Sequence, residues 1–306
     1  MAKFHLQGHR GSRGTSLENT LPSFEQALDA QVSSIETDIH LTRDGIPVLC
    51  HEPFLSQLGI RRRGQSETAS VQPILIRELA LHELREWVAS GNADPVRFPE
   101  QRADVTPAVR LYATKQGIDP FSVPTLNNLF DFVKAYAGEL GIATEKTPEQ
   151  RRRAGKLIFD LEIKYVASHA SLYVEPNLIV ERVLTAVYAS GMEKRTVIRS
   201  FDHRLLKRVA RSAGGVTTAL LIAAATPVDP VRLVHEAGTS IYCPLFDYVD
   251  ADLINACHEG GVRVLPWTAN EIEDWDRLLP WGVDGITTDF PERLRQYLES
   301  RQVELD

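Results

Sequence analysis

The chain of 306 residues has few cysteines and no long hydrophobic run. Its three cysteines, Cys50, Cys243 and Cys257, are too few and odd in number for a disulfide framework, which is compatible with a reducing compartment. No apolar run approaches the ~20 residues that cross a bilayer, and the first residues do not resemble a secretory signal. These absences favour a cytoplasmic protein, although a secreted or periplasmic form with its signal removed would look the same.

Positive charge is also scarce. Lys and Arg number 34 against 41 Asp and Glu, giving a net charge of −7. This balance argues against a nucleic-acid binder and against a protein of anionic membrane surfaces, so we expect a small-molecule partner. The content of 43% hydrophobic and 25% charged residues is that of a globular protein with one large core.

A glycine-rich dinucleotide fingerprint is missing after the first expected strand, which disfavours an open doubly wound sheet. Short β-branched runs instead alternate with helical patterns, as in βα units of a parallel sheet. Eight such runs predict a TIM (β/α)8 barrel. The runs are Phe4 to His9, Ile35 to Leu41, Lys156 to Lys164, Thr196 to Ser200, Thr217 to Ile222, Ser240 to Leu245, Val262 to Thr268 and Asp284 to Thr288.

One long segment does not fit the repeat. It extends from about residue 54 to about residue 123, is rich in Pro, Gly and Arg, and has a pattern that indicates a helix from Arg77 to Ser90. Because it leaves from the strand ends where barrel active sites form, we expect it to cap the active-site face. We therefore expect a single barrel domain over residues 1–306, with a long insertion after the second strand region.

Paired acidic residues stand out on two of the expected strands. Glu36 and Asp38 are two residues apart and so face the same way, where like charges are costly unless a cation or proton shares them. Glu162 and Lys164 repeat that spacing. An all-carboxylate set of Glu36, Asp38 and Glu162 favours one hard divalent cation, Mg²⁺ or Ca²⁺, over zinc.

Two histidines follow strand-like runs near these acids, and one has an arginine beside it. His9 and His51 are candidates for proton transfer, one as acid and one as base, in an order that the sequence leaves open. Arg10 and Lys164 are candidates for binding a phosphate. These residue types together suit cleavage of a phosphodiester.

The motifs in chain order resemble the glycerophosphodiester phosphodiesterase family. The matching motifs are His9-Arg10-Gly11, Glu18-Asn19-Thr20, Glu36-x-Asp38, Thr42-x-Asp44-Gly45, His51-x-Pro53, Glu162-x-Lys164, Ser200-Phe201-Asp202, Trp267-Thr268-x-Asn270 and Asp284-Gly285-x-x-Thr288-Asp289. The resemblance implies a TIM barrel that cleaves glycerophosphodiesters, products of phospholipid deacylation, to glycerol 3-phosphate and an alcohol.

The resemblance also implies roles for single residues. It assigns His9 and His51 to acid and base catalysis, Arg10 and Lys164 to the phosphate, and Glu36, Asp38 and Glu162 to the metal. Trp267 is similar to the aromatic wall beside the glycerol, and Phe201 adds to that wall. Two departures bear on the alcohol side: Glu52 replaces the usual Asp, and Leu58 to Gly64 replaces a Thr-Thr-x-Gly stretch.

Three other functions are open from the sequence. The same barrel could cleave lysophospholipids in a phospholipase D-like reaction if the insertion leaves an apolar groove. Lys164 could form a Schiff base in an aldolase, although Glu162 on the same face should raise the pKa of this lysine and disfavour that chemistry. The third function is a barrel that binds phosphorylated ligands without catalysis. The presence of both histidines and all three acids argues against it.

Overall fold

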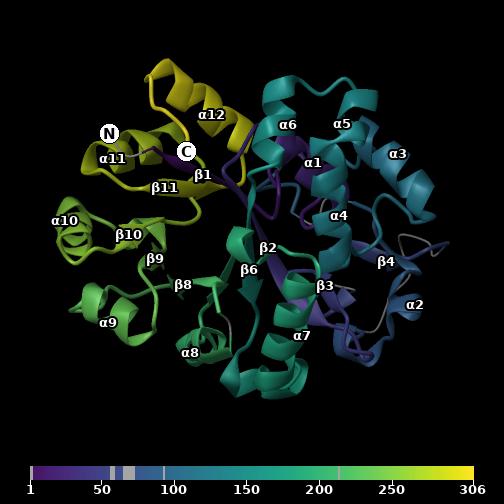
Figure 1. Ribbon diagram of the computed structural model, residues 1–306, viewed down its shortest axis with the longest axis horizontal. Helices are drawn as coiled ribbons and strands as arrows, with labels where there is room; N and C mark the ends of the chain where they lie inside the picture. Colours follow the sequence, from purple (N-terminus) through teal and green to yellow (C-terminus); the bar gives the residue numbers. More distant parts are fainter. Residues whose placement is uncertain (1–2, 56–58, 65–72, 92–93, 213) are drawn as a thin grey trace.

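The computed structural model describes residues 3–55, 59–64, 73–91, 94–212 and 214–306. In this part of the chain, eight parallel strands surround a common axis in the order β10-β9-β8-β7-β6-β2-β1-β11 (Figure 1). Next to the two outer strands of this order, the backbone N–H of Asp284 donates to the carbonyl of Val264 over 3.0 Å. This contact makes the sheet a nearly closed barrel. The predicted TIM barrel is confirmed. The strands are β1 (His5–His9), β2 (Ser34–Leu41), β6 (Ile158–Ile163), β7 (Thr196–Ser200), β8 (Thr217–Ile222), β9 (Ile241–Pro244), β10 (Arg263–Val264) and β11 (Gly285–Thr288).

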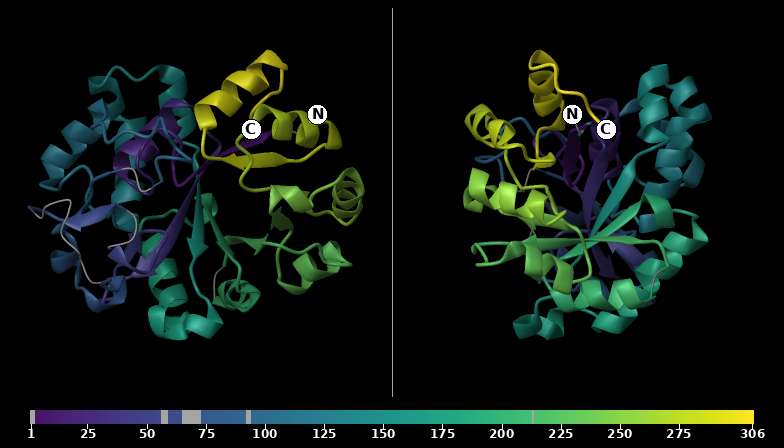
Figure 2. Two further views of the ribbon diagram at one scale, coloured as in Figure 1. Left: turned by 180° about the vertical axis from the view of Figure 1, so that it is seen from behind. Right: turned by 60° about the vertical axis from the view of Figure 1, so that its left-hand side comes forward.

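Helices surround the strands on the outside (Figure 2). The first begins at Leu21, because the Thr20 side chain accepts a hydrogen bond from the Ser23 backbone and Pro22 occupies the first turn. None of the described helices is long and apolar enough to cross a membrane. The helices are α1 (Leu21–Asp29), α4 (Leu126–Ala137), α5 (Glu139–Ala143), α6 (Pro148–Ala154), α7 (Pro176–Ala189), α8 (His203–Ser212), α9 (Pro230–Glu236), α10 (Ala251–Glu259), α11 (Ile272–Trp281) and α12 (Pro291–Ser300).

The two faces of each barrel strand have different surroundings. Outward-facing residues such as Leu6, Ile35 and Phe159 pack with the helices in the main hydrophobic core. Inside the barrel, one half is apolar and is formed by β7 to β10, with Val197, Ala219, Leu221, Ile241, Cys243 and Leu265. The other half is polar, and β1, β2, β6 and β11 supply most of it. The candidate site residues come mainly from this polar half.

The segment between β3 (Pro47–Leu49) and α4 contains short elements. They are β4 (Ile60–Arg62), the 3-10 helix η2 (Ile76–Glu78), α2 (Leu81–Leu84), β5 (Trp87–Ala89) and α3 (Pro107–Gln116). The predicted helix from Arg77 to Ser90 is wrong, because Trp87 to Ala89 are extended and pair antiparallel with β4. Their aromatic and β-branched side chains favour a strand. Leu58, the first residue of the unusual stretch named above, lies outside the described residues.

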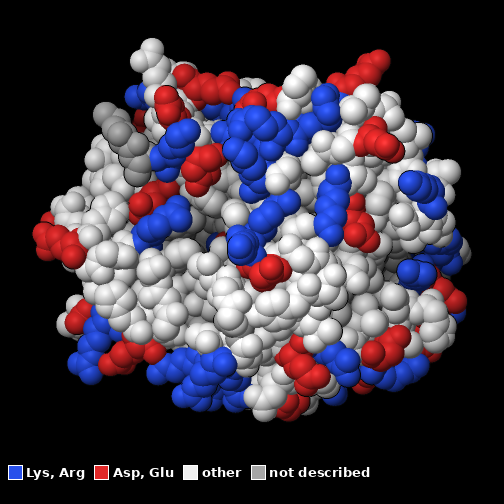
Figure 3. Space-filling model, viewed as in Figure 1, with Lys and Arg blue, Asp and Glu red and all other residues white. Residues whose placement is uncertain are grey.

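Charged side chains of both signs are mixed on the face shown in Figure 3. Blue Lys and Arg groups lie beside red Asp and Glu groups over much of this view, and neither sign covers the face.

Candidate active site

The register of three strands brings the acidic residues together. Parallel pairing sets His9 beside Glu36, and Asp38 beside Glu162. One ligand oxygen from each of Glu36, Asp38 and Glu162 lies within 4.8 Å of the others, and all three residues are buried. Residues 36 and 38 share a face of β2, as the spacing predicts, and β6 supplies the third acid from the next strand.

The charges in this cluster are strongly coupled to their surroundings. Burial raises the pKa of Glu36 well above its usual value, and the neighbouring Asp38 raises it further. Burial also opposes ionisation of Asp38, but Lys164 and Arg10 hold the pKa of this carboxyl well below its usual range. Lys164 Nζ lies 2.9 Å from Asp38 Oδ1 and 2.7 Å from Glu162 Oε1. The cluster therefore has three acids close to two permanent cations.

The buried polar atoms of the cluster leave room for one further partner. Within the described ranges, two buried atoms of the cluster make no aligned hydrogen bond: the acceptor Asp38 Oδ1 and the donor Arg10 Nε. Lys164 Nζ lies 2.9 Å from Asp38 Oδ1 without such an alignment, so this buried oxygen can still accept an ion or a water. The converging groups are all carboxylates, the ligands that Mg²⁺ and Ca²⁺ prefer. The residues present thus fit a hard divalent cation.

A tight turn after β1 places Arg10 against the cluster. Arg10 and Gly11 have φ values of 53° and 89°, and a Cβ on Gly11 would lie 2.5 Å from Ser23 Oγ. The Ser23 hydroxyl donates to the Arg10 carbonyl over 2.9 Å, which ties the turn to α1. Arg10 Nε then lies 3.1 Å from Asp38 Oδ2, and Arg10 Nη1 donates to both oxygens of Glu18. Glycine at position 11 is required by both the turn and this close approach.

His9 is held by a chain of hydrogen bonds from β11 and its neighbours. Its Nδ1 lies 2.6 Å from Asp289 Oδ1, and Asn270 Nδ2 donates to Asp289 Oδ2 over 2.7 Å. Its Nε2 is 3.8 Å from Glu36 Oε2, on the side of the acidic cluster. Burial lowers the pKa of His9 to about 4, although Asp289 counters part of that fall. Asp289 thus orients His9, which the sequence did not predict.

His51 follows β3 and is more accessible, with 28% of its side chain exposed. Its Nδ1 lies 2.8 Å from Glu52 Oε1, so the glutamate that departs from the family pattern contacts this imidazole directly. His40 Nε2 donates to the His51 carbonyl over 3.1 Å. His40 also stacks on Tyr173 with ring centroids 5.9 Å apart. These contacts fix the loop that carries His51.

One cavity gathers nearly all of the predicted site residues. Asp38 is the exception, because it is fully buried behind the cavity wall. Phe201 and Trp267 form the aromatic part of the wall, with ring centroids 5.5 Å apart and planes at 77°. The predicted residues that line the cavity are His9, Arg10, Glu36, His51, Glu162, Lys164, Phe201 and Trp267.

Three arginines beyond the predicted set also line this cavity: Arg13, Arg97 and Arg199. Arg13 Nε lies 2.6 Å from Glu18 Oε2. The sequence did not predict a role for these arginines at the site. Arg97 comes from the insertion, and Arg199 faces inward from β7, where no motif indicates a function. Each of the three guanidinium groups also faces an acid: Glu18 for Arg13, Asp289 for Arg97 and Asp160 for Arg199.

The barrel and the side chains at the carboxyl ends of its strands define a TIM-barrel hydrolase of phosphoric diesters. A family model described as the glycerophosphoryl diester phosphodiesterase family matches residues 9–293, and the chain belongs to that family. The resemblance drawn from the motifs is therefore confirmed.

Individual relatives agree with this placement. A glycerophosphodiester phosphodiesterase of Caldanaerobacter subterraneus subsp. tengcongensis is 24% identical over 286 residues, covering 94% of each chain. Lysophospholipase D GDPD3 of Mus musculus is 24% identical, covering 98% of this chain and 83% of the mouse protein.

Solved structures share the fold. One from Silicibacter pomeroyi DSS-3 has a TM-score of 0.81 and 29% identity, and covers 100% of this chain and 96% of its own. An Oleispira antarctica phosphodiesterase, solved in complex with its product sn-glycerol-3-phosphate, has a TM-score of 0.71 and 18% identity over 96% of each chain.

Proposed function

We propose that this chain hydrolyses glycerophosphodiesters to glycerol 3-phosphate and an alcohol. The observation that supports this most is the convergence of three buried carboxylates, within 4.8 Å of one another, in the wall of a cavity that both His9 and His51 also line. Phosphodiesters resist cleavage because their negative charge repels nucleophiles and because alkoxides leave poorly. The site offers groups suited to each difficulty.

Glu36, Asp38 and Glu162 would hold one divalent cation, Mg²⁺ or Ca²⁺. When bound, such an ion withdraws charge from the phosphoryl group and orients the attacking oxygen. The position of Asp38 Oδ1 supports this assignment, since this buried oxygen contacts only the Lys164 ammonium, without an aligned hydrogen bond, and a carboxylate oxygen can also accept a metal.

Arg10 and Lys164 would bind the phosphate. Both are held against the acidic cluster, and acidic neighbours raise the pKa of each above its usual value despite burial, so both stay charged. Each also lines the cavity. Phe201 and Trp267 would form the wall against the glycerol carbons, because an aromatic surface suits their C–H groups.

His9 and His51 would divide the proton transfers. One imidazole takes a proton from the attacking water as the new P–O bond forms, and the other gives a proton to the alcohol oxygen as the old P–O bond breaks. Each has its Nδ1 on a carboxylate, Asp289 for His9 and Glu52 for His51, which leaves each Nε2 for the reaction. A diester with a p-nitrophenol leaving group would tell them apart, because loss of the acid matters little when the leaving group needs no proton.

The geometry disfavours the aldolase alternative. Lys164 contacts two carboxylates, and its raised pKa keeps the amine protonated and therefore a poor nucleophile. Borohydride in the presence of a carbonyl substrate should leave Lys164 unmodified.

The proposed activity is tested by incubating the purified chain with glycerophosphocholine and glycerophosphoethanolamine, with and without a chelator. We expect release of glycerol 3-phosphate that stops on chelation and returns on addition of Mg²⁺ or Ca²⁺. Binding of these diesters by calorimetry without any product would instead support a barrel that only binds phosphorylated ligands.

A further inference from the structure

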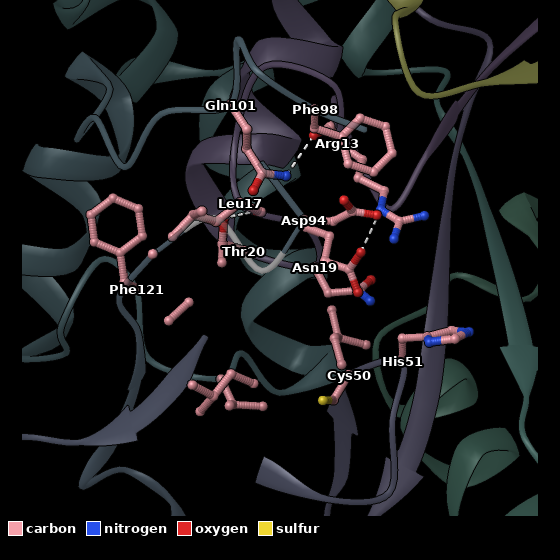
Figure 4. Close-up of a pocket in the computed structure, with 16 residues that line it drawn as sticks. Arg13, Leu17, Asn19, Thr20, Cys50, His51, Asp94, Phe98, Gln101 and Phe121 are labelled. Carbon is pink, nitrogen blue, oxygen red and sulfur yellow. Dashed lines mark hydrogen bonds and ion pairs between the residues drawn. The ribbon is translucent and has the colours of Figure 1, made fainter. Parts of the chain in front are cut away.

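A second cavity of about 250 Å³ adjoins the first. The two share His51 and Arg13 in their walls, so they meet where the proposed reaction takes place. Figure 4 shows the second cavity extending from His51, past Cys50, toward Phe121. Nothing in the proposed chemistry uses this space.

The lining of the second cavity is largely hydrocarbon. Leu17, Leu49, Val123 and Phe121 contribute from the barrel loops and from the chain leading to α4. Ile60 and Ala89 contribute from the insertion, where they are direct cross-strand partners in the β4–β5 ribbon. Partners of this kind lie on one face of a ribbon, and this face is turned toward the cavity.

The polar groups in this wall are already bonded to the protein. Glu18 is held by Arg10 and Arg13, with oxygen to nitrogen distances of 3.0 and 2.6 Å. The Asn19 amide donates to Asp38 over 2.9 Å and accepts from Thr37 over 2.7 Å. The other carboxylate of this wall, Asp94, accepts from the Arg97 backbone N–H over 3.1 Å. The space therefore suits an apolar occupant.

We propose that this second cavity binds an unbranched hydrocarbon chain carried by the phosphodiester substrate. The inference rests on the proposed function, because a phosphodiester has two organic substituents and only one can lie against the aromatic pair Phe201 and Trp267. The described residues of the insertion that line this cavity, such as Ile60 and Ala89, then select what the second substituent is. The chain can belong either to the alcohol or to an acyl group on the glycerol.

The native enzyme tests this with two substrate series. The first is glycerophospho-n-alkanols from ethyl to octyl, and the second is glycerophosphoethanol bearing 1-acyl chains from acetyl to octanoyl. Burial of each methylene should raise kcat/KM by about fourfold until the cavity is full. The series that rises identifies which substituent enters the cavity, and a flat response in both series overturns the proposal.

Matched variants on the ribbon localise the effect. Ala89→Phe fills the cavity and should reduce the ratio of octyl to ethyl kcat/KM, or the corresponding acyl ratio, to near one. Val88→Phe adds the same ring at the neighbouring position, which does not line this cavity, and should keep the native ratio. Ile60→Ala should move the plateau to a longer chain. An unchanged ratio in Ala89→Phe, or equal loss in Val88→Phe, contradicts the assignment.

Failure of this inference is distinguishable from failure of the proposed function. Hydrolysis of the ethyl diester with no gain for longer chains leaves the phosphodiesterase assignment standing and removes only the hydrocarbon subsite. Absence of hydrolysis for every member of both series, with metal present, overturns both.

Discussion

Two layers of buried charge lie one above the other in the barrel, and they use the same kinds of side chain. In the lower layer, Asp160 pairs with Arg199 through both carboxylate oxygens. Gln7 donates to Asp160 over 2.8 Å and accepts from Arg199 over 2.8 Å and from Thr287 over 2.6 Å. One acid meets one base, and Gln7 is bonded at both ends of its amide.

The upper layer also has a residue on β6, but its acids and bases are not matched one to one. Glu162 is two residues beyond Asp160 on β6 and joins Glu36 and Asp38, with Lys164 and Arg10 as the neighbouring cations. Here Asp38 Oδ1 lacks an aligned donor and the pKa of Glu36 is raised. The difference teaches that one acid and one base can satisfy each other inside the barrel, whereas three acids crowded beside a cavity keep a repulsion that a further cation would relieve.

The largest expected effect concerns the imidazoles beside the upper layer. His9→Ala and His51→Ala should each lower kcat by roughly 10² to 10⁴, because each removes a proton-transfer group, while thermal unfolding changes little. Steady-state kinetics and a melting curve measure the two quantities. His235→Ala on the exposed side of α9 is the control and should retain native turnover. Near-native rates in both site variants would defeat the catalytic assignment.

Removing the arginine of the lower layer should lower the free energy of unfolding. Arg199→Met leaves the buried Asp160 carboxylate without its partner and should lower the free energy of unfolding by ~3–5 kcal/mol. Denaturant titration measures this loss. The double variant Asp160→Asn with Arg199→Met should recover part of it, because the uncompensated charge is gone. A single variant as stable as the native chain would show that the two layers do not differ as described.

A smaller effect on turnover is expected for Asp289, whose hydrogen bond orients His9. Asp289→Asn weakens the contact that orients His9 and should reduce kcat by roughly 10- to 100-fold, as for other residues that position a functional side chain. The half-saturating metal concentration should stay native, since Asp289 is not in the acidic cluster. A shift in metal dependence equal to the loss in kcat would assign Asp289 a different role.

The smallest effect belongs to a third charge group, which lies outside the sheet. Lys146 Nζ is 2.7 Å from both Glu25 and Asp29. Burial opposes its charge, but hydrogen bonds to these acids raise the pKa of Lys146 above 10.5. Its contribution to stability is therefore present below that pH and is lost as the pH rises through the higher folded value.

Unfolding free energies between about pH 8 and about pH 12 check this for the native chain and Lys146→Met. The native chain should lose stability more steeply with pH than the variant, and turnover at the lower pH should be equal in both. Parallel pH profiles would contradict the contribution of this lysine.

Much of the fold and of the site geometry follows from local patterns. The β-branched runs predict the barrel strands, and spacing alone places Glu36 and Asp38 on one face. The convergence with Glu162 needs only parallel strands in a common register. The assigned roles of these residues stay predictions.

Other features depend on contacts between distant segments. Arg199 occupies an inward position of β7, and only its pairing with Asp160 on the neighbouring strand explains a buried arginine there. The helix expected from Arg77 to Ser90 failed because Trp87 to Ala89, whose side chains favour a strand, pair with β4, a partner that the helical pattern alone does not show. The apolar cavity likewise requires Ile60, Phe121 and Leu17 to meet, and no sequence window contains all three.

Metal titration by isothermal calorimetry, on the native chain and on Glu162→Gln, tests the open upper layer most directly. We expect one Mg²⁺ or Ca²⁺ per native chain, an affinity at least ~10-fold weaker in the variant because a charged ligand is lost, and hydrolysis that follows occupancy. Native-like binding in Glu162→Gln, or full hydrolysis by native chain that binds no divalent ion, would contradict the role of the three carboxylates.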